Sequence, residues 1–495
     1  YKIETVRYTT RKPKKKSRAA KKHGADGPSG GIESLLPSFI GLVILACGVM
    51  AKMGFRGRAT VAGIDLGTTN SVICVQAPAK GVGEIDCIPD PFTDSPIIPS
   101  VVSFLDPAEI PYGKKEKSDL KPHPSHVVVG DAAKRRIDTH PHQTLYHAKR
   151  VVGRDASDQA ITTLAAEVEF KVATQDDQVF FNVPHGKEQL SVSPHYVGAY
   201  VVNHLIDMTK KFLGHENVKS AVICVPAKFN AAQRQATVDA FKTAGVTVTR
   251  IIEEPSAAAL AYGLHKKDGV DYILVYDFGG GTLDVSLLHV TNGFADVMGT
   301  DGDDNLGGAD FDAAVAKFLY KKSQRAVDNV GEAMAALTSD DLEDDLLKVC
   351  AVLNKTPLCS HSSLHTIGEK LKIQLSSFPD GDGTVTAQCL STSSTSPGSV
   401  SEFCSSLEPV ELTMTSDEYN KAAQSLFDRS VAPVRRLLKD LDIGTDEIDE
   451  VVMVGGTTRM PQIRELVKKE MKIETLNVHI DPDLTVAYGA ASIID

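Results

Sequence analysis

One short pattern occurs twice in this chain and constrains its fold more than any other feature. Residues 63–70 read GIDLGTTN and residues 277–284 read DFGGGTLD, each after an apolar run typical of a buried strand. Each copy contains an Asp, a glycine-containing turn and a Thr in the same order. Glycine lets a backbone approach an anion closely, turn amides and Thr hydroxyls donate to phosphate oxygens, and an Asp can hold hydrated Mg²⁺. Two copies therefore predict two lobes that close on one nucleotide.

The segments that follow each copy match as well. After each comes an apolar strand with a helix, and then a second strand that leads through an acidic residue and a Pro into a helix ending in Ala-Tyr-Gly. After the first copy these segments are 221–225, 231–244 and 250–263. After the second copy they are 451–454, 461–471 and 479–491. Three matches in the same order favour a duplicated α/β lobe. The alternative is two unrelated α/β domains that share common turn residues.

Composition indicates a globular protein with a substantial core. The 495 residues are enough for two or three domains, and 42% of them are hydrophobic. The net charge of −11 conceals a basic tail, because residues 1–31 carry ten Lys or Arg against two acidic residues. The acidic remainder excludes a nucleic-acid-binding body. The tail itself is either a nuclear-import or RNA-binding patch or, as we favour, a disordered flank.

An apolar segment over residues 32–55 follows this tail. Its centre, Leu35–Ala51, has no charged residue over 17 positions, which is the low end of a membrane-spanning length. A buried core helix is the alternative, but the segment precedes the first predicted strand. We expect a signal anchor or a cleaved signal peptide, because the excess of upstream Lys and Arg places the tail in the cytosol. The body would then lie in the lumen of the endoplasmic reticulum.

The eight cysteines fit no metal-binding spacing. Cys74 and Cys224 lie in predicted strands and are interpreted as small core hydrophobes. Four more cysteines lie between residues 350 and 404, where a lumenal location would permit disulfides that the sequence cannot assign. Residues 378–408 are rich in Ser, Thr, Gly and Pro and predict a long surface loop or hairpin insertion.

From about residue 62 to its last residue the chain resembles the ATPase core of the 70-kDa heat-shock protein family. The resemblance rests on long motifs: GIDLGTTNS, HAKRVVGR, VPAKFNAAQRQAT, EEPSAAALAYGL, DFGGGTLDVS, NLGGADFD and VGGTTRMP. It implies an α/β fold, the duplicated actin-like, ribonuclease H-like ATPase fold, with two lobes around a nucleotide cleft. We therefore expect lobe I over residues 61–265 and lobe II over residues 266–495, with the insertion 378–408 and a C-terminal helix that returns to lobe I.

The same resemblance implies a role for each motif residue. The phosphates of ATP or ADP would lie between two loops, Mg²⁺ would be held through water by two Asp residues, and K⁺ is a further candidate ion. The loop residues are Gly67, Thr68, Thr69 and Asn70 from the first copy and Gly279, Gly280 and Gly281 from the second; the metal residues are Asp65 and Asp277; and the catalytic residues are Lys149, Glu254, Asp284 and Thr282. The alternative for the charged members is a salt-bridge network between lobes.

The adenosine pocket is predicted from the resemblance and from helical spacing. Three of its residues fall at i, i+3 and i+7 of one helix face. The predicted set is Glu369, Lys372, Ser376, Gly455, Gly456, Arg459 and Asp483. Ile373 departs from the family, where most members have an Arg that stacks on adenine, and Ala309 replaces a family Glu. Losing a cation–π contact costs roughly 0.5–2 kcal/mol, which weakens binding about two- to thirty-fold.

Three functions remain open on these residues. The first is a slow Mg²⁺-dependent ATPase of chaperone ancestry, since phosphoryl transfer to water needs mainly positioning and charge neutralisation. The second is a nucleotide-dependent binding module without catalysis. A small-molecule kinase is the third, and no substrate motif supports it. We expect no peptide-binding domain in this chain, nucleotide-exchange factors and other proteins as partners, membrane contact through the N-terminal segment, and no nucleic acid.

Overall fold

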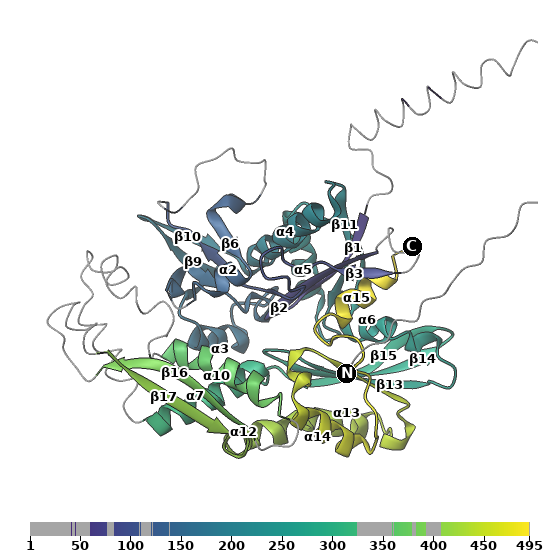
Figure 1. Ribbon diagram of the computed structural model, residues 1–495. Coiled ribbons are helices and arrows are strands. Elements are labelled where there is room, and N and C mark those ends of the chain that lie inside the picture. The colour runs from purple at the N-terminus through teal and green to yellow at the C-terminus, as the bar shows by residue number, and fades with distance from the viewer. Residues whose placement is uncertain are drawn as a thin grey trace, which may run out of the picture. The chain divides into compact units, whose positions relative to one another are not determined.

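The computed structural model (Figure 1) describes residues 60–76, 84–107, 109, 120, 122–137, 139–323, 359, 361–378, 383–392 and 407–494, together with residues 41 and 45. Contacts divide the chain into residues 1–57 and residues 58–495, and the elements with described bounds all belong to the second unit. The predicted basic tail and nearly all of the apolar segment 32–55 lie outside the described residues. Within the described residues no helix is both long enough and apolar enough to cross a membrane.

The first phosphate-loop motif lies on a six-stranded sheet. Its strands in spatial order are β12 (Thr247–Glu253), β11 (Val218–Val225), β1 (Thr60–Leu66), β2 (Asn70–Gln76) and β3 (Ile85–Cys87), with β4 (Ile98–Pro99) beside β2. Strand β1 pairs antiparallel with β2 and parallel with β11, which in turn pairs parallel with β12. The motif is therefore the tight turn of the β1–β2 hairpin, at the end of a buried strand.

The second motif occupies the same place in a four-stranded sheet. This sheet contains β15 (Phe294–Asp303), β14 (Leu283–Thr291), β13 (Tyr272–Phe278) and β18 (Glu450–Val454). Strand β13 pairs antiparallel with β14 and parallel with β18, as β1 does with β2 and β11. The predicted duplication is thus present in the pairing of the strands as well as in the residues.

The two sheets differ at the strand that follows. A short apolar strand was expected near residue 479, as the counterpart of β12. Instead the backbone there forms only an isolated parallel bridge between Val452 and Asn477. The segment is polar and contains Pro482, which has no backbone N–H to donate to a ladder. The expectation of a strand was wrong for this reason, whereas the helices predicted at 231–244 and 461–471 are present.

Smaller sheets and helices complete the unit. The smaller sheets are β6 (Val127–Val129), β5 (Val102–Phe104) and β7 (Thr144–Leu145); β10 (Glu188–Val192), β9 (Gln178–His185) and β8 (Lys171–Gln175); and β16 (Thr384–Thr392) with β17 (Leu407–Thr415). The α-helices are α2 (Asp131–Lys134), α3 (Gln159–Glu167), α4 (Pro194–Leu213), α5 (Ala231–Thr243), α6 (Glu254–Ala261), α7 (Gly308–Ser323), α10 (His361–Leu375), α12 (Ser416–Ser430), α13 (Ala432–Asp440), α14 (Pro461–Met471) and α15 (Thr485–Ser492). The 3₁₀ helices are η1 (Pro124–His126), η2 (Pro141–Gln143), η3 (Ala148–Arg150), η4 (Leu264–Lys266), η6 (Thr445–Glu447) and η7 (Gly456–Arg459). Strand β16 lies within the predicted insertion and pairs antiparallel with β17, most of which follows the insertion, whereas residues 379–382 and 393–406 lie outside the described part.

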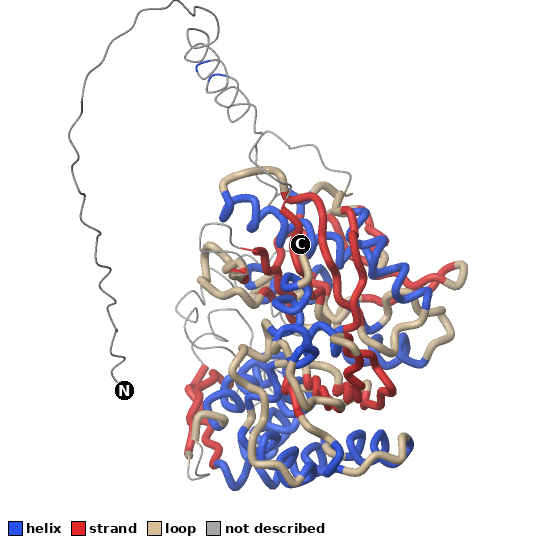
Figure 2. The backbone as a smooth tube through the Cα atoms, turned by 90° about the vertical axis from the view of Figure 1, so that its right-hand side faces the viewer, coloured by secondary structure: helices blue, strands red, loops and turns tan. Residues whose placement is uncertain are grey.

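Helices cover both faces of the first sheet (Figure 2). Side chains that alternate along its strands pack into two different cores. On β11, Ala221 and Ile223 pack in the core that contains α4, whereas Val222 and Cys224 pack in a second core with α6. This second core also takes side chains from β13 and β18. Since it draws on strands of both sheets, it joins the two halves of the unit.

Helices α6 and α15 meet within this shared core. A Cβ atom on Gly489 would lie 1.9 Å from the carbonyl oxygen of Ala257, so only glycine permits this crossing. Similarly, a Cβ on Gly63 of β1 would lie 2.3 Å from the backbone nitrogen of Ala491. Figure 1 shows α15, near the C-terminus, beside the purple strands β1 and β3. The small residues Gly489, Ala257 and Gly63 therefore allow close packing of α15 against α6 and β1.

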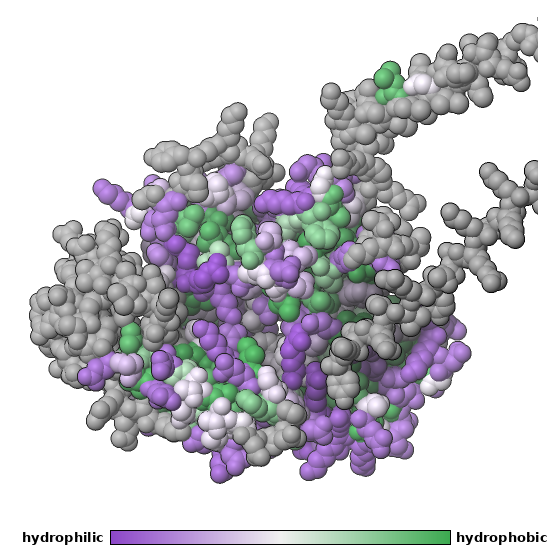
Figure 3. Space-filling model, in the orientation of Figure 1, coloured by the Kyte–Doolittle hydropathy of each residue, from purple (hydrophilic) through white to green (hydrophobic). Residues whose placement is uncertain are grey.

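Outside the cores, the helices of the second half are strongly amphipathic. Helix α14 buries Ile463, Val467 and Met471 and turns its Lys, Arg and Glu residues outward. Hydrophilic residues accordingly dominate the surface over α13 and α14 in the space-filling view (Figure 3). The apolar stripe of these helices is sufficient to hold them on the sheet.

The cysteines require one correction. Cys74, expected to be a free core residue, forms a disulfide with Cys87, its cross-strand neighbour on β3. Cys359 and Cys389 form a second disulfide. The strand pattern correctly placed Cys74 in the core but could not show that its partner lies opposite on the next strand. Cys224 is buried and free, as predicted.

Candidate nucleotide site

A cavity of about 680 Å³ is lined by residues from both large sheets. Its lining includes all of the residues predicted for the site. These are Asp65, Gly67, Thr68, Thr69, Asn70, Lys149, Glu254, Asp277, Gly279, Gly280, Gly281, Thr282, Asp284, Glu369, Lys372, Ser376, Gly455, Gly456, Arg459 and Asp483. The structure therefore brings residues more than 400 positions apart in sequence to one space, while their individual roles stay predictions.

The two phosphate loops face each other across this cavity. A Cβ atom on Gly280 would lie 2.4 Å from the hydroxyl oxygen of Thr69, so the loops approach too closely for any larger residue there. The Thr69 hydroxyl is buried and has no hydrogen-bond partner among the described residues. A buried hydroxyl without a partner is costly, and a phosphate oxygen would satisfy it. The loops thus form a paired set of donors suited to a polyphosphate.

Lys149 and Glu254 form an ion pair at this end of the cavity. Lys149 lies in η3, and its Nζ donates to Oε1 of Glu254, the first residue of α6, over 2.8 Å. Both side chains are largely buried. Burial lowers the pKa of Lys149, but Glu254, Asp65 and Asp277 outweigh this and raise the pKa above its ordinary value. Lys149 therefore carries its positive charge at any physiological pH.

Two buried Asp residues lie near the ends of the equivalent strands β1 and β13. Burial raises the pKa of Asp65 to about 7, although Lys149 opposes the shift. Burial, followed by repulsion from Glu254 and Asp284, raises the pKa of Asp277 well above its usual value. Oδ1 of Asp65 is buried with no hydrogen-bond partner among the described residues. The positive charge of Lys149 thus offsets the cost of burying these two carboxylates only in part, and a bound cation would supply the rest.

These residues fit a magnesium ion held through water. Mg²⁺ usually keeps several waters and binds through one or two carboxylates together with phosphate oxygens. In the described part of the chain no group of three or more His, Cys, Asp or Glu could hold a metal directly. The unpartnered Asp65 oxygen and the buried Asp277 would therefore hold the ion only together with a nucleotide.

The nucleoside end of the cavity is formed by α10 and the segment after β18. Lys372 lies 2.7 Å from the carboxylate of Asp312 and donates to the carbonyl of Gly308 over 3.0 Å. Ser376 donates back to the carbonyl of Lys372, so its hydroxyl is engaged within its own helix. Glu369 pairs with Lys134 from α2, at 3.0 Å. The three predicted residues in and just after α10 thus line the cavity, and the Glu369–Lys134 pair links α10 to α2.

Arg459 is held on the other side of this end. Its guanidinium donates to Asp483 at 2.8 and 3.1 Å and also binds Asp481. Gly455 has φ of 81°, and a Cβ there would lie 2.5 Å from the carbonyl oxygen of Phe278. The glycine is therefore required for the turn that carries Arg459. Ile373 also lines the cavity and keeps 57% of its surface exposed.

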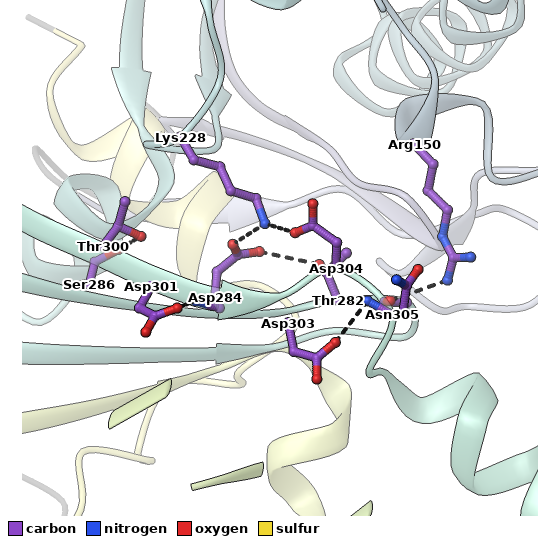
Figure 4. Close-up of polar contacts among 12 residues, drawn as sticks. Arg150, Lys228, Thr282, Asp284, Ser286, Thr300, Asp301, Asp303, Asp304 and Asn305 are labelled. Atoms are coloured by element: carbon purple, nitrogen blue, oxygen red, sulfur yellow. Dashed lines mark hydrogen bonds and ion pairs between the residues drawn. The ribbon is translucent and has the colours of Figure 1, made fainter. Parts of the chain in front are cut away.

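Several charged residues of the lining were not predicted. Lys228 contacts Asp284 and Asp304, and Arg150 donates to the carbonyl of Gly281 over 3.2 Å (Figure 4). Asp312 lies beneath Lys372, where burial raises its pKa to about 6. Lys228, Arg150 and Asp312 each stand inside motifs that carry the resemblance. The motifs VPAKFN, HAKRVVGR and NLGGADFD could have pointed to these residues. Their contacts could not be predicted, because their partners lie far away in sequence.

Two paired loops, a buried Lys–Glu pair and a base-sized pocket on a duplicated α/β fold define an actin-like two-lobe ATPase fold. The sequence profile of the family described as Hsp70 protein matches residues 61–495. The chain therefore belongs to the Hsp70 family, whose members are nucleotide-binding chaperone ATPases that interact with cochaperones. This confirms the family and the fold class that the motifs predicted.

Proposed function

We propose that this chain is a slow, Mg²⁺-dependent ATPase core that hydrolyses ATP to ADP and phosphate. The observation that carries the proposal is the buried Lys149–Glu254 pair beside the two facing phosphate loops. A site that binds nucleotide without hydrolysing it needs only hydrogen-bond donors for the phosphates. A fixed positive charge beside the loops, itself anchored by a carboxylate, is suited to stabilising charge that develops during phosphoryl transfer.

The residues have separate roles in this mechanism. Turn amides and the hydroxyls of Thr68 and Thr69 bind and orient the phosphate chain, while the Thr282 hydroxyl donates to Asp284 and holds that carboxylate beside the loop. Lys149 stabilises the γ-phosphate under attack, and Glu254 holds the Lys149 ammonium in place and accepts a hydrogen bond from the attacking water. Asp65 and Asp277 would hold Mg²⁺, which would neutralise phosphate charge. The buried surroundings strengthen each of these interactions relative to bulk water.

Single-turnover hydrolysis of γ-labelled ATP tests the proposal. We expect Lys149→Ala to slow phosphate release by at least roughly 100-fold, the usual effect of removing one group that stabilises transition-state charge. Nucleotide affinity should change far less, because the loops remain. Lys242→Ala is the matched control, since Lys242 is 60% exposed on α5 and pairs with nearby Asp239, away from the cavity.

The second candidate is a nucleotide-dependent binding module without catalysis. Ile373 favours it, because an exposed aliphatic side chain at the nucleoside end cannot make a cation–π contact with the base. This candidate predicts equal, background phosphate release from the wild type and Lys149→Ala, with tight nucleotide binding in both. Release of phosphate with no acceptor other than water would discount a small-molecule kinase.

We also propose that the protein works in the lumen of the endoplasmic reticulum. Two disulfides support this, because disulfides persist in oxidising compartments and are rare in the cytosol. The apolar segment 32–55, the insertion 378–408 and the aliphatic residue at 373 resemble the microsomal stress-70 ATPase-core member of the family. Protease protection of intact microsomes, with an epitope at each end of the chain, tests both topology and cleavage. Digestion of the ATPase core in sealed microsomes would contradict the proposal.

A further inference from the structure

Lys228 occupies an unusual position at the phosphate end of the cavity. It follows β11, in the first large sheet, by three residues, yet its Nζ lies 2.8 Å from Asp284 on β14 of the second sheet. The same Nζ also contacts Asp304, just after β15. Figure 4 shows the Lys228 side chain reaching both carboxylates, which come from the opposite half of the unit. Its side chain is 32% exposed, so this is not a freely solvated surface pair.

Both oxygens of Asp284 are engaged as a result. Oδ1 faces the Lys228 ammonium, and Oδ2 accepts a hydrogen bond from the Thr282 hydroxyl over 3.2 Å. The two carboxylates raise the pKa of Lys228, although burial lowers it, so the ammonium stays charged. An ammonium has three donors, and two carboxylates use two of them. One N–H remains for a phosphate oxygen or a water in the cavity that Lys228 lines.

The charges around the phosphate loops give this arrangement a function. Five carboxylates line that end of the cavity: Asp65, Glu254, Asp277, Asp284 and Asp304. The ammonium groups of Lys149 and Lys228 oppose them, and Arg154, which pairs with Asp158, also lies 3.8 Å from Asp304. Lys228 is the cation that Asp284 and Asp304 share. Without Lys228 the negative charge of Asp284 would lose this partner, and a monovalent cation beside Asp284 would be needed to balance that charge.

We propose that Lys228 is a tethered monovalent cation: its ammonium takes the place beside Asp284 that a dissolved ion such as K⁺ would otherwise occupy. Lys228 is thus a positioning residue, which acts on nucleotide through Asp284 and the charge balance of the loops. Asp304 holds the ammonium in place from the other side. The inference rests on the proposed nucleotide site, and it makes K⁺ dispensable for this chain.

The test measures the release of fluorescent mant-ADP in the presence of Mg²⁺, in KCl and in choline chloride at equal ionic strength. Choline is too large to replace an ion between two carboxylates. We expect the wild-type release rate to differ less than about twofold between the salts. Lys228→Met should release mant-ADP roughly tenfold faster in choline than in KCl, the effect of losing one hydrogen-bonded charge. Lys242→Met, on the exposed face of α5, should behave as the wild type.

Three results would overturn the inference. Wild-type release could depend on K⁺ as strongly as release from Lys228→Met does. Lys228→Met could speed release equally in both salts, which would make Lys228 only a tie between the two halves. Failure of the wild type to bind mant-ADP in either salt would instead refute the nucleotide site itself, and the inference with it.

A second variant and a second readout separate these outcomes from misfolding. Lys228→Gln keeps a polar side chain of similar length and should show the same salt dependence as Lys228→Met. Crystals of each protein soaked in RbCl give a readout that needs no activity. We expect anomalous density beside Asp284 in Lys228→Met and none there in the wild type; the same peak in both would contradict the proposal.

Discussion

At the phosphate end of the cavity the polar groups come from strand ends and tight turns, whereas at the nucleoside end they come from α10 and the turn after β18. The phosphate end buries its charges: Asp65 and Lys149 are packed among the ends of the central strands. At the nucleoside end burial is uneven: the Lys134–Glu369 pair keeps 44% and 36% of its side-chain surface exposed, whereas the Lys372–Asp312 pair keeps only 11% and 15%. Buried charges interact strongly and exposed ones weakly. Substitutions at the phosphate end should therefore have large effects, and those at the exposed Lys134–Glu369 pair small ones.

The largest effect expected from this comparison is at Asp65. Asp65→Asn should remove most of the affinity that Mg²⁺ adds for ADP, a loss of roughly 10- to 150-fold, because a buried charged acceptor is lost. Isothermal titration of ADP with and without Mg²⁺ measures it. A Mg²⁺ response equal to that of the wild type would mean that the buried carboxylate has no part in holding the ion.

The same variant has a pH signature in the nucleotide-free protein. An unfolded Asp releases its proton near pH 3.8, whereas folded Asp65 keeps it until about pH 7. Over that window the unfolded state binds fewer protons, so the free energy of unfolding falls as pH rises. Urea unfolding at pH 5 and pH 7.5 should show a smaller decline for Asp65→Asn than for the wild type. If the free energy of unfolding declined equally in Asp65→Asn and in the wild type, groups other than Asp65 would cause the pH dependence.

An intermediate effect is expected at Ile373. Ile373→Arg should tighten ATP binding about two- to thirty-fold, since a guanidinium could then stack on the adenine ring. Titration calorimetry of ATP measures the change. Ile373→Leu is the matched control, because it keeps an aliphatic side chain at this 57% exposed position. Equal affinities for all three proteins would show that this side of the pocket does not touch the base.

The smallest effect is expected at the half-exposed pair across the nucleoside end. Lys134→Met should speed ADP release by no more than about fivefold, because exposed ion pairs contribute about 1 kcal/mol or less. Stopped-flow release at 50 and 500 mM salt checks this, since screening should reduce the difference between wild type and variant. A loss as large as that of Asp65→Asn would break the proposed contrast between the two ends.

Much of the fold could be predicted from the sequence because the duplication is local. The two loop motifs, the helix at 461–471 and the fold class depend on turn chemistry and hydrophobic period, which short segments carry. The strand expected near residue 479 failed because Pro482 and polar neighbours outweighed the analogy with β12. Cys74 was misjudged because a buried strand position looks the same for a free thiol and for a disulfide.

The order of strands, turns and helices, and with it the family, was determined by the sequence itself, since glycines, prolines and apolar runs act on neighbouring residues. The lobe boundaries stay predictions. Only the tertiary structure decided which charges meet: Lys228 with Asp284 and Asp304, and Lys372 with Asp312. These partners lie 56 or more positions apart, and nothing local to either one specifies the other. Lys228 meets its partners because two sheets pack through a shared core that places their loops against each other, and Lys372 meets Asp312 because α10 packs on α7.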